Sequence, residues 1–145
     1  MKRSKRLEPV HALMRAAERE WALKVAGMQA RLQEAEQRCL ELQRYLAEYQ
    51  KAFHQRAKAG IEVRGVRDYQ TFIARLGDAV QQQHGVIEQL GRDCEQARAH
   101  WQQAAMRKSA VGKVIAKAVC EDQQLEARRL QRETDERAQR FGGAR

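Results

Sequence analysis

The stretch Ala59-Gly60-Ile61-Glu62-Val63-Arg64-Gly65 decides the fold, because it interrupts a chain whose sequence is otherwise typical of helix. Each glycine costs a helix interior about 1 kcal/mol relative to alanine, so this pair predicts that one helix ends and another begins here. A connection this short makes the flanking helices antiparallel neighbours. We predict an all-α, single-domain antiparallel coiled-coil hairpin, with helix one over about 9–58, the bend over about 59–66 and helix two over about 67–140.

Apolar residues recur at alternating steps of three and four on both sides of this bend, which is the heptad pattern of a coiled coil. In helix one this stripe comprises Val10, Met14, Ala17, Trp21, Val25, Met28, Leu32, Ala35, Cys39, Leu42, Leu46, Tyr49 and Phe53. In helix two it comprises Tyr69, Ile73, Leu76, Val80, Gln83, Ile87, Leu90, Cys94, Ala97, Trp101, Ala104, Lys108, Val111, Ile115 and Ala118. Folding about the bend predicts that Phe53 packs against Ile73 and Cys39 against Ile87. We call these two stripes together the seam.

Composition limits the function classes. The chain has 145 residues, a net charge of +9 and one proline, Pro9, which suits the first turn of a helix. Nucleic acid, acidic proteins and anionic membranes are candidate partners for such a basic chain. No apolar run reaches the roughly 18 residues that span a bilayer, and the basic start lacks the apolar core of a signal peptide. We expect a cytoplasmic protein.

The cysteines and histidines offer no chemistry. Cys39 and Cys94 lie on the seam, where cysteine behaves as a small apolar residue, and Cys120 lies off it. No spacing matches a metal site, and the histidines His11, His54, His84 and His100 are scattered with no acidic or nucleophilic partner at a useful spacing. We predict a protein that is not an enzyme and that binds no metal, cofactor or small-molecule ligand.

The predicted helices differ in length, so helix two should overhang the start of helix one from about Val119 to Arg140. Two interpretations of this end stay open. It is either a solvated, partly frayed end or a basic tip inserted into a partner. The basic residues that would form such a tip are Lys5, Arg6, Arg128, Arg129 and Arg132.

A second feature lies near the bend, where Tyr45, Phe72 and Ala79 each stand one position before a seam residue. A two-helix hairpin buries only a narrow stripe, so these side chains should be at least half exposed. Together with Leu42, Tyr49 and Leu76 they predict an apolar, aromatic patch of the kind that marks a protein interface. The alternative is that the aromatic residues merely cover the splayed end of the hairpin.

The run from Leu42 to Gln83 resembles the flagellar FliJ-type export proteins, and the resemblance extends over essentially the whole chain. The residues that carry it are Tyr45, Tyr49-Gln50, Ala59-Gly60-Ile61, Tyr69-Gln70, Phe72-Ile73, Leu76 and Ala79-Val80. The resemblance implies a coiled coil similar to the γ subunit of rotary ATPases. Such a protein would be the central stalk of the hexameric flagellar type III export ATPase. It would also contact the cytoplasmic linker of the membrane export gate and escort chaperones.

The resemblance also implies roles for particular residues. The face that binds the gate would comprise Leu42, Tyr45, Tyr49, Phe72, Leu76 and Ala79. Arg38 and Gln83 depart from the family pattern, which has glutamine and histidine at these places. The basic tip would enter the ATPase ring. The protein would then be cytoplasmic and peripherally associated with the inner membrane at the flagellar basal body, meeting the membrane only through the export apparatus.

Three alternatives remain on the sequence. The first is a stalk of the related virulence-type secretion system, although the bend motif favours the flagellar branch. The second is a basic coiled coil that binds nucleic acid, with affinity that falls steeply with salt. Interspersed acidic residues and the lack of a groove-reading module argue against it. The third, a purely structural coiled coil, leaves Tyr45 and Phe72 unexplained.

Overall fold

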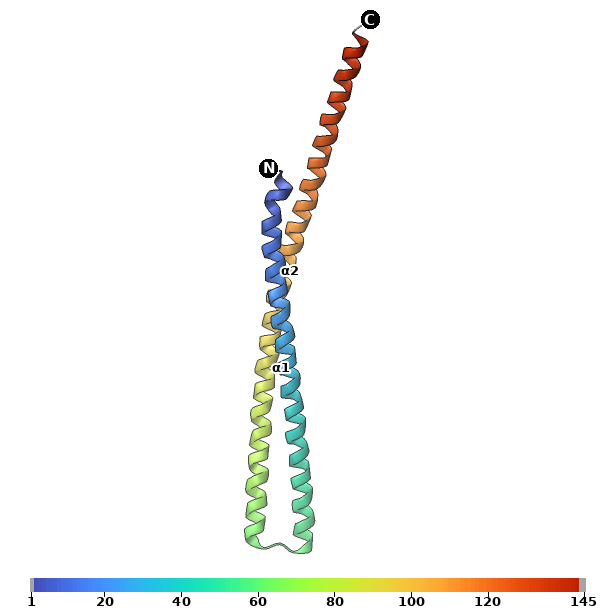
Figure 1. Ribbon diagram of the computed structural model, residues 1–145. Helices are drawn as coiled ribbons and strands as arrows, with labels where there is room; N and C mark the ends of the chain where they lie inside the picture. Colours follow the sequence, from blue (N-terminus) through green and yellow to red (C-terminus); the bar gives the residue numbers. More distant parts are fainter. Residues whose placement is uncertain (1, 144–145) are drawn as a thin grey trace. The chain divides into compact units, whose positions relative to one another are not determined.

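The computed structural model describes residues 2–143, and its architecture is a helical hairpin. Helix α1 spans Arg3–Ala59 and helix α2 spans Val63–Gly142. The two helices pack against each other, and Figure 1 shows them running in opposite directions from the connection that joins them. Residues 2–143 contain no β-strand. The predicted all-α hairpin is confirmed.

Both helices contribute to two compact units, which we describe separately. Unit 1 combines Met1–Ala22 with His100–Arg145, of which residues 2–22 and 100–143 are described. Unit 2 is Leu23–Ala99 and contains the connection between the helices. The prediction of a single domain stays a prediction.

The connection in unit 2 is shorter than expected, because only Gly60, Ile61 and Glu62 lie outside the helices. Gly60 has a φ of 89°, a left-handed conformation that glycine adopts without the steric penalty of a Cβ. The Val66 N–H then donates to the Glu62 carbonyl at 3.1 Å, which helps to start α2 at Val63 rather than near 67. Gly65 therefore lies inside α2, where a Cβ would come within 2.9 Å of the Ile61 side chain.

The short connection shifts the register of unit 2 by about one helical turn. Phe53 packs against Tyr69, with ring centroids 5.7 Å apart, where the sequence predicted Ile73. Likewise the Cys39 Sγ atom lies 3.9 Å from His84 Nδ1, where Ile87 was expected. The predicted register was wrong because it assumed a bend of eight residues, and a bend centred nearer Ile61 brings earlier residues of α2 opposite α1.

The seam contains every buried apolar residue among those described, although most seam residues are half-buried and Val10 and Tyr49 are exposed. The buried apolar residues are Ala35, Cys39, Val80, Cys94, Ala97, Ala104 and Ala118, all of them seam positions. Almost all are small, because a pair of helices can enclose short side chains completely while longer ones extend past the partner. The polar seam residue Gln83 is accommodated by donating its Nε2–H to the Ala35 carbonyl at 2.9 Å.

Unit 1 begins with helix α1 at Arg3, whereas the sequence predicted that helix one starts at about residue 9. The Ser4 hydroxyl is buried and donates to Asp122 Oδ2 at 3.0 Å, and the Arg6 N–H donates to the Lys2 carbonyl at 3.2 Å. These bonds hold α1 from Arg3, so Pro9 lies within the helix rather than in its first turn. At that position the proline lacks the N–H that would bond to the Lys5 carbonyl, and its ring crowds that carbonyl.

A polar layer crosses the seam of unit 1 around Glu18. Its Oε1 atom accepts a hydrogen bond from Trp101 Nε1 at 3.0 Å, and its Oε2 atom lies 3.8 Å from Lys108 Nζ. One turn away the Trp21 and His100 rings stack with centroids 4.5 Å apart. The Glu18 carboxylate is thus the hydrogen-bond acceptor for Trp101 and the counter-charge for the seam residue Lys108. The sequence analysis did not predict this role.

We expect alanine substitutions at two glycines to have opposite effects on stability. Gly77 is helical with open space around its Cα, so Gly77→Ala should raise the free energy of unfolding by about 0.5–1 kcal/mol. Gly60→Ala should lower it by about 1–2 kcal/mol, because alanine disfavours the left-handed conformation. Urea unfolding followed by circular dichroism measures both, and equal effects would contradict the conformational explanation.

We also expect Glu18→Ala to destabilise unit 1 by about 1–3 kcal/mol, since it leaves the Trp101 indole N–H and the Lys108 ammonium without an acceptor. Glu18→Gln should retain most of the stability, because its amide oxygen can still accept from Trp101. Thermal unfolding of the two variants makes the comparison, with fluorescence of Trp21 and Trp101 reporting on unit 1. Equal stability of the alanine variant and the parent would show that the polar layer contributes nothing.

Candidate functional site

The six residues predicted to bind a partner near the bend, which we call the aromatic face, all lie in unit 2. They are Leu42, Tyr45 and Tyr49 of α1 and Phe72, Leu76 and Ala79 of α2. Tyr45 is 54% exposed, Phe72 41% and Tyr49 38%, whereas Leu42, Leu76 and Ala79 are half-buried. The aromatic rings are thus available to a partner, and the half-buried aliphatic residues lie closer to the interface between the helices.

Contact across the hairpin holds two of these rings in place. The Tyr49 and Phe72 rings pack at a centroid separation of 4.5 Å with an interplanar angle of 53°, a favourable tilted geometry. Tyr45 stands one heptad position before Leu46 and remains the most exposed of the three. The arrangement offers ring faces, ring edges and two tyrosine hydroxyls, the groups that dominate protein–protein recognition.

Charged residues border the aromatic face. Glu41, Arg44 and Glu48 line a shallow hollow beside Tyr45. A polar rim around apolar anchors is the usual composition of a protein interface. Arg38 and Gln83, which the sequence placed at the edge of this face, differ in environment. Arg38 is exposed, whereas Gln83 directs its amide to the Ala35 carbonyl inside the seam.

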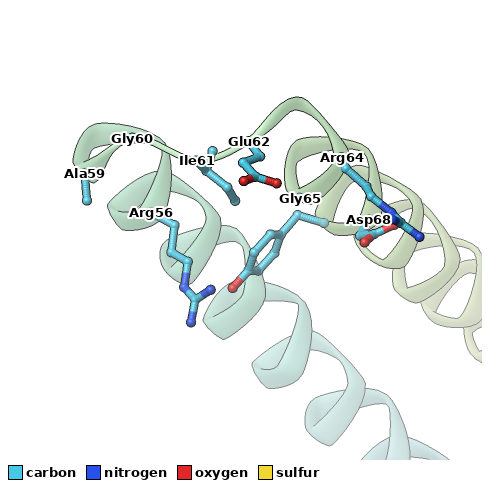
Figure 2. A pocket seen from close by; sticks show the side chains of 9 residues that line it. Arg56, Ala59, Gly60, Ile61, Glu62, Arg64, Gly65 and Asp68 are labelled. Atoms are coloured by element: carbon cyan, nitrogen blue, oxygen red, sulfur yellow. The ribbon is translucent and has the colours of Figure 1, made fainter.

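A second hollow lies at the connection of unit 2 and is shown in Figure 2. Arg56 of α1 lines one side, and Glu62, Arg64 and Asp68 follow from the connection and the start of α2. The charged residues that line it include both basic and acidic side chains. Gly60 and Gly65 also line it and add no side chain that would fill it. The residues present no nucleophile beside a base, so this hollow has the character of a solvated turn.

The five tip residues lie in unit 1, but the structure does not gather them into one cluster. Lys5 and Arg6 belong to the first turns of α1, at the level where Ser4 contacts Asp122. The other three, Arg128, Arg129 and Arg132, lie six to ten residues farther along α2, which corresponds to roughly 9–15 Å of helix. All five are exposed, and Arg129 donates to Glu126 Oε1 at 2.8 Å.

The described residues hold little that could support other chemistry. Between residues 2 and 143, no three His, Cys, Asp or Glu side chains come together in a way that could hold a metal ion. Cys39 and His84 do approach each other, a pair that their separation in sequence concealed, but Cys39 is buried in the seam. Neither helix, over the same residues, is long and apolar enough to cross a membrane.

We expect the aromatic face to contribute unequally to stability. Phe72→Ala should lower the free energy of unfolding by about 0.5–1.5 kcal/mol, because it removes the contact with Tyr49. Tyr45→Ala should change it by less than about 0.5 kcal/mol, since this side chain is more than half exposed. Urea unfolding of each variant tests this, and a large loss at Tyr45 would indicate that the ring serves the fold.

Comparison with known proteins agrees with the motif around the bend. The family model described as "Flagellar FliJ protein" matches residues 3–144, nearly the whole chain. No curated protein and no solved structure matches the chain. Because the family match includes both helices and the connection between them, the chain belongs to the flagellar FliJ protein family, a non-enzymatic component of flagellar protein export.

Proposed function

We propose that this protein is a stalk that links the hexameric flagellar export ATPase to the cytoplasmic linker of the membrane export gate. In this proposal the aromatic face binds the gate, and the tip residues of unit 1 enter the ATPase ring. The protein performs no chemistry itself, and its role is to couple ATP turnover to export. Escort of export chaperones belongs to the same proposal, as does a position at the flagellar basal body.

The observation that carries the proposal is that three aromatic rings grouped on one side of the hairpin remain substantially exposed. The seam buries mostly small residues, and Tyr45, Tyr49 and Phe72 extend beyond it. Large exposed apolar side chains grouped on one face of a protein are typical of partner-binding sites. Membership of a flagellar export family supports an export protein as that partner.

The separation of the candidate surfaces supports binding of two partners at once. The aromatic face belongs to unit 2, whereas Lys5, Arg6 and the overhang arginines belong to unit 1. Each helix continues through both units without a break. Partners bound at the two surfaces would thus be joined by continuous helix, which transmits force better than a flexible linker.

The proposal predicts that Tyr45→Ala/Phe72→Ala abolishes binding to the purified cytoplasmic domain of the gate and leaves binding to the export ATPase intact. Pull-down with the purified partners measures both, and circular dichroism checks that the helices survive. The matched control is Leu23→Ala/Leu40→Ala, which removes two exposed apolar side chains of the same unit outside the aromatic face. This control should bind both partners as the parent does.

A second variant tests the other surface. Arg128→Gln/Arg129→Gln/Arg132→Gln should weaken ATPase binding and leave gate binding unchanged. If the parent protein bound neither partner but retained DNA in a salt-sensitive manner, the nucleic-acid alternative would replace the stalk. If the Leu23→Ala/Leu40→Ala control lost gate binding as fully as the aromatic variant, the aromatic face would not be the specific site.

A further inference from the structure

Positive charge is concentrated in one part of unit 1. Residues 2–17 and 100–120 together contain nine Lys or Arg side chains and one carboxylate, that of Glu8. The overhang that follows, residues 121–143, contains five arginines and six carboxylates. The arginines at the C-terminal end, which suggested a basic tip, are therefore balanced locally. The net positive charge belongs to the segment in which α1 and α2 are paired.

Within this segment the helical periodicity places four of the nine cations, Arg6, Arg107, Lys113 and Lys117, on one side, which we call the basic face. Arg6 and Leu13 are seven residues apart on α1, and Arg107 and Val114 are seven apart on α2, so each pair lies on one side of its helix. A hollow lined by Leu13, His100 and Arg107 brings these two sides together. Lys117 continues the row on α2, and Met106 and Lys113 form its outer edge.

The opposite side of the same helix pair is different in character. There α2 carries Ala105 and Gly112. The His11 ring packs over Gly112, and a Cβ added to this glycine would lie 3.5 Å from His11 Nε2. Ser4 and Asp122 close that side with their hydrogen bond. Arg15, one turn after His11, is a cation on this side, which therefore carries fewer cations than the basic face.

The cations of the basic face are not neutralised within the chain. Arg6, Arg107, Lys113 and Lys117 are exposed, and no carboxylate of residues 2–143 forms an ion pair with any of them. Lys108, whose ammonium approaches Glu18, faces the seam and is separate from this set. The face therefore presents uncompensated positive charge to solvent.

Large aliphatic side chains stand among these cations. Met106 is 72% exposed, Leu13 68% and Val114 43%. None of them is buried in the seam, where the buried residues of this unit are Ala104 and Ala118. Exposed aliphatic side chains interspersed with Lys and Arg on one helical face are characteristic of surfaces that bind at a membrane interface.

We propose that the basic face of unit 1 binds directly to an anionic lipid surface, with the cations at the phosphate headgroups and Leu13, Met106 and Val114 inserted between them. This inference goes beyond the stalk function, since it requires neither the gate nor the ATPase. It also departs from the expectation that the chain meets the membrane only through the export apparatus.

The chemistry of the basic face favours a lipid surface over a protein or a nucleic acid. Protein-binding hot spots use aromatic anchors seated in a compact cluster, as on the aromatic face of unit 2, whereas these side chains are aliphatic and spaced apart. The phosphates of a nucleic acid would pair with the cations but would make no favourable contact with the apolar side chains of Leu13 and Met106. A bilayer interface accommodates both kinds of group without requiring a complementary shape.

Flotation of the full-length protein with vesicles tests the proposal. Binding is expected to vesicles of phosphatidylglycerol mixed with phosphatidylcholine, to fall as salt is raised, and to be absent from pure phosphatidylcholine. Arg107→Gln/Lys113→Gln/Lys117→Gln should weaken binding on the order of 100-fold, since each cation near an anionic surface contributes about fivefold. The charge-matched control Arg128→Gln/Arg132→Gln/Arg137→Gln, in the overhang, should change binding by less than about fivefold.

The apolar contribution separates lipid insertion from simple attraction to anions. Leu13→Gln/Met106→Gln should weaken vesicle binding at least tenfold, by loss of buried hydrocarbon, and leave retention on heparin unchanged. The matched apolar control is Leu125→Gln/Leu130→Gln, two exposed leucines of the overhang, and it should bind vesicles as the parent does. Circular dichroism confirms that each variant remains helical.

Several outcomes would overturn the proposal. One is equal loss of vesicle binding in the overhang arginine variant, which would indicate a general effect of net charge. Another is unchanged affinity of Leu13→Gln/Met106→Gln for vesicles, which would indicate that the face attracts polyanions without inserting into lipid. A third is no vesicle binding by a parent protein that still binds the gate and the ATPase, which would sink this inference and leave the stalk proposal standing.

Discussion

The narrow seam between two helices is the constraint on which the rest of this structure depends. Only residues such as Ala35, Ala97 and Ala118 disappear entirely into it, because a single neighbouring helix covers only one stripe of each partner. Apart from Cys39, Cys94 and Val80, every apolar side chain larger than alanine that the structure describes remains partly in water. Exposed aromatic and aliphatic groups are therefore built into the hairpin, and their grouping on particular faces is what distinguishes candidate binding surfaces from background.

Polar residues in the seam illustrate how such a narrow interface fixes its register. Gln83 reaches a backbone carbonyl of the facing helix, and Glu18 receives both the Trp101 indole and the Lys108 ammonium. Each of these contacts forms in only one alignment of the two helices. If one helix moved along the other by a turn, a half-buried polar group would lose its partner. Apolar layers alone would tolerate such a slip more readily.

The surfaces of the two units differ in chemistry, which argues for different partners. Unit 2 offers clustered aromatic rings with a polar rim, the composition of a site for a protein. Unit 1 offers cations and aliphatic side chains on one side of the helix pair. In the two proposals the aromatic face of unit 2 binds the gate, whereas unit 1 carries both the tip residues for the ATPase ring and the basic face for a membrane surface.

The sequence by itself determined the hairpin, the seam and the exposure of Tyr45 and Phe72, because heptad periodicity and a glycine-containing break are local signals. The tertiary structure decided the register, since it depends on where the second helix begins, and α2 begins at Val63, directly after the short connection that follows Gly60. It also decided which charges are free. Glu18 and Asp122 find partners across the seam, far away in sequence, and periodicity cannot reveal which carboxylate meets which donor.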